Sequence, residues 1–390
     1  MVEARNDQAP SPIRLGMVGG GEGAFIGAVH RMAARLDGHY TLVAGALSST
    51  PEKALRSGAA LGLDPARTYP DFASMARAEK RRKDGIEAVA IVTPNHMHAP
   101  AALAFLKAGI HVICDKPLTS TLADARKLAL AAERSGLVFC VTHNYTGYPM
   151  VRQARAMVAA GELGEIRVVQ VEYPQDWLTT DLEATGQKQA AWRTDPARSG
   201  AGGCIGDIGT HAYNLADFIT GLEVSELSAE LTSFVPGRRV DDNVQIMLRY
   251  GNGARGMLWA SQVAPGNENN LKIRVYGSKG GLEWRQEHPN QLLFTPFGEA
   301  PRTLSRGTGS AGPAAARVTR IPGGHPEGYL EAFATIYSEA ATAIRAARAG
   351  TPVAAEVVFP GIHDGVKGVA FIATAIRSSK AGGKWLRLQP

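Results

Sequence analysis

Short apolar runs alternate with helical patterns over residues 13–142, and each run is brief enough to be a single strand. Strands are predicted over residues 13–18, 40–47, 86–93, 111–114 and 138–142, and helices over 26–36, 51–61, 100–108 and 122–135. Strands that alternate with helices build βαβ units, whose right-handed crossovers give a parallel sheet covered by helices on both faces. The pattern therefore predicts an N-terminal, doubly wound α/β domain.

The pattern changes after about Gly161, where strands follow one another with turn signals between them. Strands are predicted over residues 166–173, 227–234, 243–250, 254–262, 271–277, 281–285 and 291–295, and helices over 207–220 and 329–348. Gly251-Asn252-Gly253 is a strong hairpin signal, so we expect an α+β domain with an open, mainly antiparallel sheet. Residues 305–316 are rich in Gly, Ser and Ala and are expected to form a mobile loop.

A glycine-rich turn follows the first predicted strand, with Gly19, Gly21 and Gly23 ahead of the next helix. Glycines at this place permit a tight turn and let backbone N–H groups approach a pyrophosphate at the start of a helix. Gly19 and Gly21 fit the first two positions of the G-x-G-x-x-G/A pattern, and either Ala24 or Gly27 can fill the third. A flexible turn would look the same, but the flanking strand and helix favour a dinucleotide site.

The end of the second strand bears on the choice between NAD and NADP. An acidic residue at this place holds the ribose hydroxyls in NAD-specific folds, and here it is absent. Ser48, Ser49 and Lys53 could instead bind a 2′-phosphate, so we expect that NADP is accepted, without excluding NAD. Alternatively, Ser49 or Thr50 is an ordinary N-cap before Pro51 at the first helical position, and both interpretations can hold together.

These patterns divide the chain of 390 residues into three expected parts. Residues 1–12 are expected to be a loose N-terminal tail, and residues 13–145 a dinucleotide-binding Rossmann domain. Residues 146–390 are expected to form a substrate and oligomerisation domain with the antiparallel sheet, whose C-terminal helices are able to pack back on the first domain.

Composition argues against several classes of function. Hydrophobic residues make up 45% and charged residues 20% of the chain, the balance of an ordinary globular protein. The net charge of +6 is mild, and the basic run from Lys80 to Lys83 is interpreted as a solvated helix end rather than a nucleic-acid site. No apolar stretch reaches the roughly 18 residues of a membrane span, and residues 1–12 lack the apolar core of a secretory signal. Three cysteines without a C-x-x-C pair predict free thiols in a reducing cytoplasm: Cys114, Cys140 and Cys204.

Three further motifs either follow predicted strands or open a helix. They are Thr93-Pro94-Asn95-His96-Met97-His98, Cys114-Asp115-Lys116-Pro117 and Gly202-Gly203-Cys204-Ile205-Gly206-Asp207-Ile208-Gly209-Thr210-His211. Together with the glycine-rich turn, and in this order, they resemble the Gfo/Idh/MocA oxidoreductases, the family of glucose–fructose oxidoreductase and inositol dehydrogenase. The resemblance extends from residue 13 to about residue 350.

The resemblance implies a fold and a set of site residues. The family pairs a Rossmann domain with a domain built on an open antiparallel sheet, places its active site between them, and leads us to expect a homo-oligomer, dimer or tetramer. Lys116 matches the lysine of the family's E-K-P motif, in which Asp115 replaces the usual glutamate, and Asp207 and His211 match its D-x-x-x-H pair. Beyond the glycine-rich turn, the implied cofactor contacts are Thr93, Pro94, Asn95, His98, Asp115 and Lys116.

The chemistry of alcohol oxidation agrees with these assignments. The reaction removes a hydride from carbon and a proton from oxygen, so a general base must reach the hydroxyl. His211 suits this role because the ordinary pKa of histidine lies near neutrality. Asp207, on the same face of the predicted helix, is expected to orient either the imidazole or the substrate, and Lys116 to stabilise developing alkoxide charge.

Softer candidates for substrate contact lie near these motifs. Asn144 and Tyr145 end a strand that faces the expected cleft, and Arg193 precedes the glycines of the third motif. A packed tryptophan beside a surface arginine explains Arg193 and its neighbour equally well. A metal site is not expected, because the pair formed by His96 and His98 lacks a third ligand.

The sequence thus predicts an NAD(P)-dependent dehydrogenase that acts on a ring hydroxyl of a cyclic polyol or pyranose sugar such as inositol. We expect it in the cytoplasm, without nucleic-acid or membrane partners. Two alternatives stay open within the same resemblance: an NAD-dependent glycosidase that oxidises its sugar only transiently, and a sugar-sensing regulator without catalysis. The joint presence of Lys116, Asp207 and His211 argues against the regulator.

Overall fold

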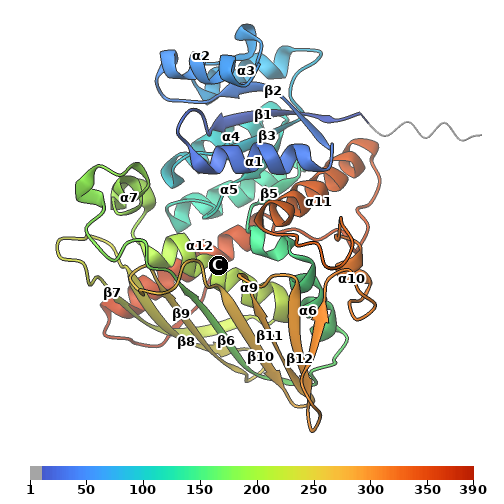
Figure 1. The fold of residues 1–390 in the computed structure, drawn as a ribbon. Helices are drawn as coiled ribbons and strands as arrows, with labels where there is room; N and C mark the ends of the chain where they lie inside the picture. The colour runs from blue at the N-terminus through green and yellow to red at the C-terminus, as the bar shows by residue number, and fades with distance from the viewer. Residues whose placement is uncertain (1–10) are drawn as a thin grey trace, which may run out of the picture.

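A computed structural model of the chain describes residues 11–390, so the expected loose tail lies outside this range apart from Ser11 and Pro12. The N-terminal part is built on a five-stranded parallel sheet with the strand order β2-β1-β3-β4-β5 (Figure 1), which confirms the predicted α/β architecture. Its strands are β1 (Ile13–Gly19), β2 (Tyr40–Ala46), β3 (Ala88–Val92), β4 (His111–Cys114) and β5 (Phe139–Val141). The helices that connect them are α1 (Phe25–Leu36), α2 (Pro51–Ala60), α3 (Phe72–Arg81), α4 (His98–Ala108) and α5 (Leu122–Ser135).

Both faces of this sheet are covered, and the chain's last two helices take part on opposite sides. One face packs against α1 and α11 (Tyr329–Ala349), and the other against α3, α4, α5 and α12 (Ile362–Lys380). Successive strand residues point to opposite faces, so Met17 enters the first core and Val18 the second. The C-terminal helices therefore complete the two cores of the N-terminal sheet.

The order of the strands determines where a ligand can bind. β1 lies between β2 and β3, so the connections that lead to its two neighbours run to opposite sides of it. Open α/β sheets bind ligands at the carboxyl ends of their strands, where the strand order reverses in this way. The glycine-rich turn, Thr93 and Asp115 follow the carboxyl ends of β1, β3 and β4, so all three lie at this edge.

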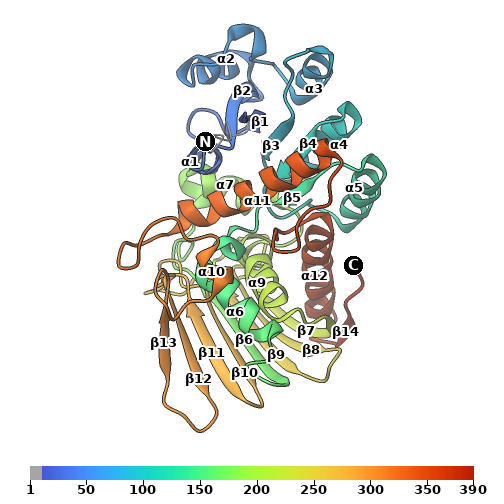
Figure 2. The ribbon, with the colours of Figure 1, turned by 90° about the vertical axis from the view of Figure 1, so that its right-hand side faces the viewer.

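The second part of the chain is built on a nine-stranded sheet in the order β13-β12-β11-β10-β6-β9-β8-β7-β14 (Figure 2). Only β6 and β9 pair in parallel, so the prediction of an open, mainly antiparallel sheet is confirmed. Its strands are β6 (Ile166–Pro174), β7 (Val224–Thr232), β8 (Asn243–Tyr250), β9 (Arg255–Ser261), β10 (Lys272–Gly277), β11 (Gly280–Arg285), β12 (Gln291–Pro296), β13 (Arg302–Ser305) and β14 (Leu386–Arg387). The remaining helices are α6 (Pro149–Ala159), α7 (Lys188–Arg193), α8 (Pro196–Ser199), α9 (Thr210–Thr220) and α10 (Pro313–Ala316).

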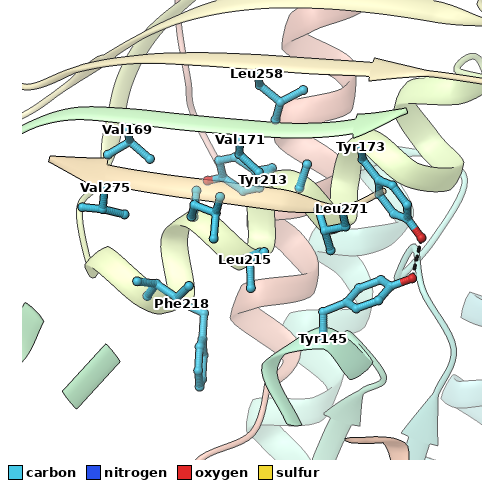
Figure 3. Packing of buried hydrophobic residues seen from close by; sticks show 14 of the residues in the cluster. Tyr145, Val169, Val171, Tyr173, Tyr213, Leu215, Phe218, Leu258, Leu271 and Val275 are labelled. Atoms are coloured by element: carbon cyan, nitrogen blue, oxygen red, sulfur yellow. Dashed lines mark hydrogen bonds between the residues drawn. The ribbon is translucent and has the colours of Figure 1, made fainter. Parts of the chain in front are cut away.

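The two faces of the nine-stranded sheet differ in character. One face packs against α9, and its buried residues include Val169, Val171, Leu258 and Val275 of the strands and Tyr213, Leu215 and Phe218 of the helix (Figure 3). On the other face, no helix among residues 11–390 covers the strands in either view. This open face carries exposed apolar side chains, which include Met247, Met257, Tyr276 and Leu293.

The segment 305–316, predicted as a mobile loop, has exposed turns at residues 307–310 but is anchored at both of its ends. It contains α10, and Arg306 is buried with its guanidinium donating to the carboxylate of Glu327 at 2.9 Å. A second bond from the same guanidinium reaches the carbonyl of Ile321 at 2.7 Å. Gly, Ser and Ala content cannot reveal this anchor, because Glu327 lies 21 residues further along the chain.

Smaller predictions can also be compared with the structure. The basic run from Lys80 to Lys83 is exposed at the end of α3, as predicted for a solvated helix end. The cysteines are free and buried, which agrees with their sequence context: Cys114, Cys140 and Cys204. Within the described part of the chain, no helix is both long and apolar enough to cross a membrane.

Candidate active site

The glycine-rich turn between β1 and α1 depends on backbone conformations that favour glycine. Gly19, Gly20 and Gly23 have φ values of +79°, +71° and +72°. A Cβ atom at Gly27 would lie 2.3 Å from the Cα of Gly20, so only glycine permits α1 to pack this closely on the turn. Gly27, rather than Ala24, therefore takes the close-packing position of the fingerprint, and the turn is the longer of the two predicted forms.

The turn is also fixed to the end of β2 and to α2. The N–H of Gly21 donates to the carbonyl of Leu47 at 3.2 Å, and the N–H of Glu22 donates to Ser57 Oγ at 3.0 Å. A Cβ at Gly21 would come within 2.6 Å of the Leu47 oxygen. Beside the turn lies a groove of about 660 Å³ lined by residues 21–25 with Ala28, Arg31, Arg56, Ser57, Ala60 and Leu61.

The residues predicted to bind the ribose end of the cofactor lie just before α2 or on its first turn. Ser48 is half-buried, and its Oγ lies 3.2 Å from both the backbone N and the Oγ1 of Thr50. Ser49 is exposed and Lys53 is half-buried. Thr50 is the N-cap residue before Pro51, as one interpretation predicted, but its side chain makes no capping hydrogen bond.

Asp115 ties together the carboxyl ends of β4 and β5. Its Oδ1 accepts hydrogen bonds from the backbone N–H of Lys116 and from Thr142 Oγ1, each at 2.9 Å, and lies 3.9 Å from His30 Nε2. Burial disfavours the charged carboxylate, but His30 and Lys116 outweigh it and hold the pKa of Asp115 well below its usual value. The carboxylate therefore positions Lys116, and sequence analysis missed the contribution of His30.

The side chains of the Thr93 to His98 motif are largely occupied by the protein itself. His98 is fully buried, with its ring nitrogens 2.8 Å from the carbonyl of Thr93 and 2.9 Å from that of Pro117. Asn95 donates from Nδ2 to the carbonyl of Ser199 at 2.8 Å. These contacts leave neither His98 ring nitrogen free for a cofactor, so the predicted cofactor contact through the His98 side chain is replaced by a supporting role.

Asp207 is surrounded by donors from three parts of the chain. Lys116 Nζ lies 3.0 Å from Asp207 Oδ1 and 2.6 Å from its backbone carbonyl oxygen. Arg193 Nε and Gln262 Nε2 donate to Asp207 Oδ2 at 3.1 and 2.9 Å. Burial opposes ionisation, yet Lys116 and Arg193 hold the pKa of Asp207 below its usual value, so the carboxylate is charged.

His211 lies near this cluster, but the structure of residues 11–390 shows no hydrogen bond between His211 and Asp207. The helix predicted over residues 207–220 begins instead with a π-helical turn, Ile205–Gly209, ahead of α9. Hydrogen bonding in a π turn spans five residues, which alters the spacing that would place residues 207 and 211 on one face. The expectation that Asp207 orients the imidazole is thus corrected, because the carboxylate is held by Lys116 instead.

The imidazole of His211 is enclosed by aromatic rings. Its ring centroid is 4.8 Å from that of Tyr145 and 5.5 Å from that of His143, both in perpendicular orientation. Burial, and then the positive charge of Lys116, lower the pKa of His211 well below its usual value. The ring is therefore neutral at physiological pH and able to accept a proton.

The predicted substrate residues Asn144 and Tyr145 are both buried. The hydroxyl of Tyr145 bonds to that of Tyr173 (Figure 3), which in turn donates to Asn269 Oδ1 at 2.7 Å. Tyr145 therefore shapes the wall around His211 with its ring. The residues that sequence analysis missed here, Tyr173, Gln262 and Asn269, belong to no motif, and only the folding of the second sheet brings them to the site.

Several buried polar atoms on α1, on α9 and at the carboxyl ends of the parallel strands have no hydrogen-bond partner. They are His30 Nε2, Thr93 Oγ1, His143 Nδ1, Asn144 Nδ2 and His211 Nδ1. Buried polar groups in proteins are normally paired, because an unpaired one costs about 1–3 kcal/mol. These atoms and the glycine-rich turn fit a ligand rich in hydroxyl and amide groups. Among residues 11–390 no cluster of three His, Cys, Asp or Glu has the arrangement of a metal site.

Comparison with known proteins agrees with this arrangement. Residues 13–143 match the family model for the oxidoreductase family with an NAD-binding Rossmann fold, and residues 151–283 match that for the GFO/IDH/MocA C-terminal domain. The chain is 37% identical over 385 residues to the uncharacterized oxidoreductase YfiI of Bacillus subtilis, covering 97% of each chain.

Two solved structures are similar over nearly the whole length. An oxidoreductase from Sinorhizobium meliloti is 60% identical, with a TM-score of 0.88 and coverage of 96% of this chain and 99% of that one. An inositol dehydrogenase homolog from Azotobacter vinelandii, complexed with NADH and myo-inositol, is 39% identical, with a TM-score of 0.90 and coverage of 97% and 98%. The family models, the relatives and the fold agree: the chain is an NAD-dependent oxidoreductase of the Gfo/Idh/MocA family.

Proposed function

We propose that this oxidoreductase is a dehydrogenase for a ring hydroxyl of a cyclic polyol or pyranose, with inositol as the first candidate. The observation that carries the proposal is the placing of Lys116 Nζ 3.0 Å from Asp207 Oδ1, beside the buried imidazole of His211. This arrangement joins a fixed positive charge to a neutral base. The similar structure that contains NADH and myo-inositol supports a polyol as the substrate.

In the proposed reaction, His211 removes the proton of the substrate hydroxyl. Lys116 donates a hydrogen bond to the same oxygen and stabilises the alkoxide charge that develops on it. Asp207 holds the ammonium of Lys116 in place, and Asn144 Nδ2 is available to a neighbouring hydroxyl. The nicotinamide of the cofactor supplies the hydride acceptor, and the backbone of Gly19, Gly21 and Gly23 would hold its pyrophosphate.

We further propose that NADP is accepted alongside NAD. Ser48 lies where NAD-specific folds carry an acid, and Lys53 is half-buried on the first turn of α2. A serine hydroxyl can donate to a 2′-phosphate, and a nearby ammonium attracts it. The 2′-position would therefore meet positive charge and hydroxyl groups instead of a carboxylate.

The open face of the nine-stranded sheet supports a homo-oligomer as part of the proposal. Met247 and Met257 on neighbouring strands are 49% and 43% exposed, and Phe297 beyond β12 is 86% exposed. Apolar side chains gathered on one uncovered face are typical of an interface between subunits. Light scattering after size-exclusion chromatography would measure the mass, and a monomer at micromolar concentration would contradict the proposal.

The buried free cysteines are consistent with a cytoplasmic protein.

A substrate panel tests the function directly. The protein is incubated with NAD or NADP and with inositols, pyranoses and aryl glycosides, while reduced nicotinamide and released aglycone are both recorded. We expect reduced nicotinamide with a polyol or free sugar and no aglycone. Release of aglycone without net formation of reduced nicotinamide would identify a glycosidase. Binding of a sugar without either product would identify a regulator. Either result would contradict the proposal.

A further inference from the structure

The short helix α7 reaches the glycine-rich turn from the second part of the chain. Figures 1 and 2 both place it beside the start of α1. The Nζ atom of Lys188, the first residue of α7, donates to the carbonyl of Gly23 at 3.2 Å. A Cβ at Gly23 would lie 3.8 Å from the same nitrogen. Lys188 therefore presents its ammonium group at the turn that leads into α1.

The other end of α7 is held at the candidate active site. Arg193, the last residue of the helix, donates from Nε to Asp207 Oδ2 at 3.1 Å, and its guanidinium lies 4.4 Å from the ring centroid of Trp192. Between the two ends, Ala190 is fully buried, and its N–H donates to Gln187 Oε1 at 2.6 Å. One six-residue helix thus links the glycine-rich turn to the carboxylate that holds Lys116.

Lys188 is one of three cations near the turn, with Arg31 and Arg56. Arg56 lies 3.6 Å from the carboxylate of Glu22, and Arg31 donates to a backbone carbonyl of the turn at 2.7 Å. An ammonium group has three N–H donors, and the structure assigns one of those of Lys188 to the turn. Among residues 11–390, no carboxylate lies within ion-pair distance of Lys188.

We propose that Lys188 binds the pyrophosphate of the dinucleotide, so that α7 closes on the cofactor from the second domain. The turn offers neutral backbone N–H groups, and Lys188 adds the positive charge that the two phosphates require. Because Arg193 ends the same helix, cofactor binding also fixes the helix that contacts Asp207. The inference rests on the dinucleotide binding of the family and goes beyond the proposed polyol substrate.

The test measures binding rather than turnover. The variants are Lys188→Met and Lys188→Arg, and the matched control is Lys127→Met, at an exposed lysine of α5. Titration calorimetry gives the Kd of NADH, of ADP-ribose, which has the pyrophosphate but no nicotinamide, and of adenosine, which has no phosphate. Hydrogen exchange of residues 183–193 is followed with and without ADP-ribose. Thermal unfolding shows that each variant is folded.

The expected result is selective for the pyrophosphate. Lys188→Met raises the Kd of NADH and ADP-ribose by about 5- to 30-fold, as for loss of a charge-assisted hydrogen bond, and leaves that of adenosine within about twofold. Lys188→Arg retains most of the affinity, and Lys127→Met equals the parent. ADP-ribose slows exchange of residues 183–193 in the parent but not in Lys188→Met. An unchanged Kd for ADP-ribose, or an equal loss for adenosine, would overturn the proposal, whether or not any polyol is a substrate.

Discussion

The ammonium of Lys116 lies 3.0 Å from the carboxylate of Asp207, although 91 residues separate the two in sequence. Lys116 follows β4 of the parallel sheet and Asp207 lies in the π turn that precedes α9 over the second sheet, so their contact joins the two halves of the chain. Asp115, Arg193 and Gln262 complete a network that fixes both groups. Lys116 and Asp207 are therefore tested by separate variants.

Lys116→Met is expected to lower kcat by about 10²-fold or more, because the charge beside the reacting oxygen is lost. The Kd of NADH should change only within a small factor, since the glycine-rich turn is untouched. Steady-state kinetics and calorimetry on the variant and on Lys127→Met measure both quantities. A kcat within a few-fold of the parent would exclude the proposed role of Lys116.

The lowered pKa of His211 predicts an unusual pH dependence. The base must be deprotonated to act, and burial together with Lys116 keeps it so to pH values well below 6.5, the ordinary histidine value. The kcat/KM for polyol oxidation should therefore stay level as the pH falls from neutrality and decline only below that value. His211→Asn should lower kcat and remove the decline. A decline that persists unchanged in His211→Asn would point to another base.

Asp207→Asn distinguishes a carboxylate that acts through Lys116 from one that acts through His211. Because Asp207 bonds to Lys116 and not to His211, the variant should resemble Lys116→Met in its loss of kcat while keeping the acidic limb of the parent. The same pH–rate profiles measure both properties. If Asp207→Asn instead abolished the acidic limb, the carboxylate would act through the imidazole, which is one of the two roles that the sequence left open.

Ser48→Asp is expected to shift the ratio of kcat/KM values toward NAD by about ten- to a hundredfold, because a carboxylate repels the 2′-phosphate and binds the ribose hydroxyls. Ser225→Asp, at an exposed serine of β7 in the second sheet, is the control. Initial rates with both cofactors give the ratio. A parent enzyme inactive with NADP, together with an unchanged ratio in Ser48→Asp, would show that another residue holds the ribose.

Gly27→Ala tests the close approach of α1 to the glycine-rich turn. Its Cβ would lie 2.3 Å from the Cα of Gly20, so the turn must shift, and we expect a loss of about 1–3 kcal/mol in stability together with weaker NADH binding. Gly309→Ala is the control, because nothing lies within 4 Å of its added Cβ. Chemical unfolding measures the stability of both variants, and calorimetry measures their Kd for NADH. Equal values for the two variants would contradict the close packing of α1 on the turn.

The motifs of the sequence predicted the parallel sheet, the antiparallel sheet and the group formed by Lys116, Asp207 and His211. They could not predict the π turn at Ile205–Gly209, which changes the spacing between Asp207 and His211, because helical periodicity assumes one fixed spacing. They also gave no sign of Gln262 or Tyr173, whose places depend on the register of the second sheet. Helices α3, α6 and α12 were not predicted, although α3 and α6 have distinct buried and exposed faces.

The packing of α11 and α12 on opposite faces of the parallel sheet has a consequence for how the protein is made. The sheet is complete in sequence once residue 141 has been synthesised, but one face is buried in part by residues 329–349 and the other in part by residues 362–380. A nascent chain that has just left the ribosome at the end of β5 would expose apolar strand residues on both sides. The nucleotide-binding half of this enzyme therefore reaches its final fold only after translation is nearly finished.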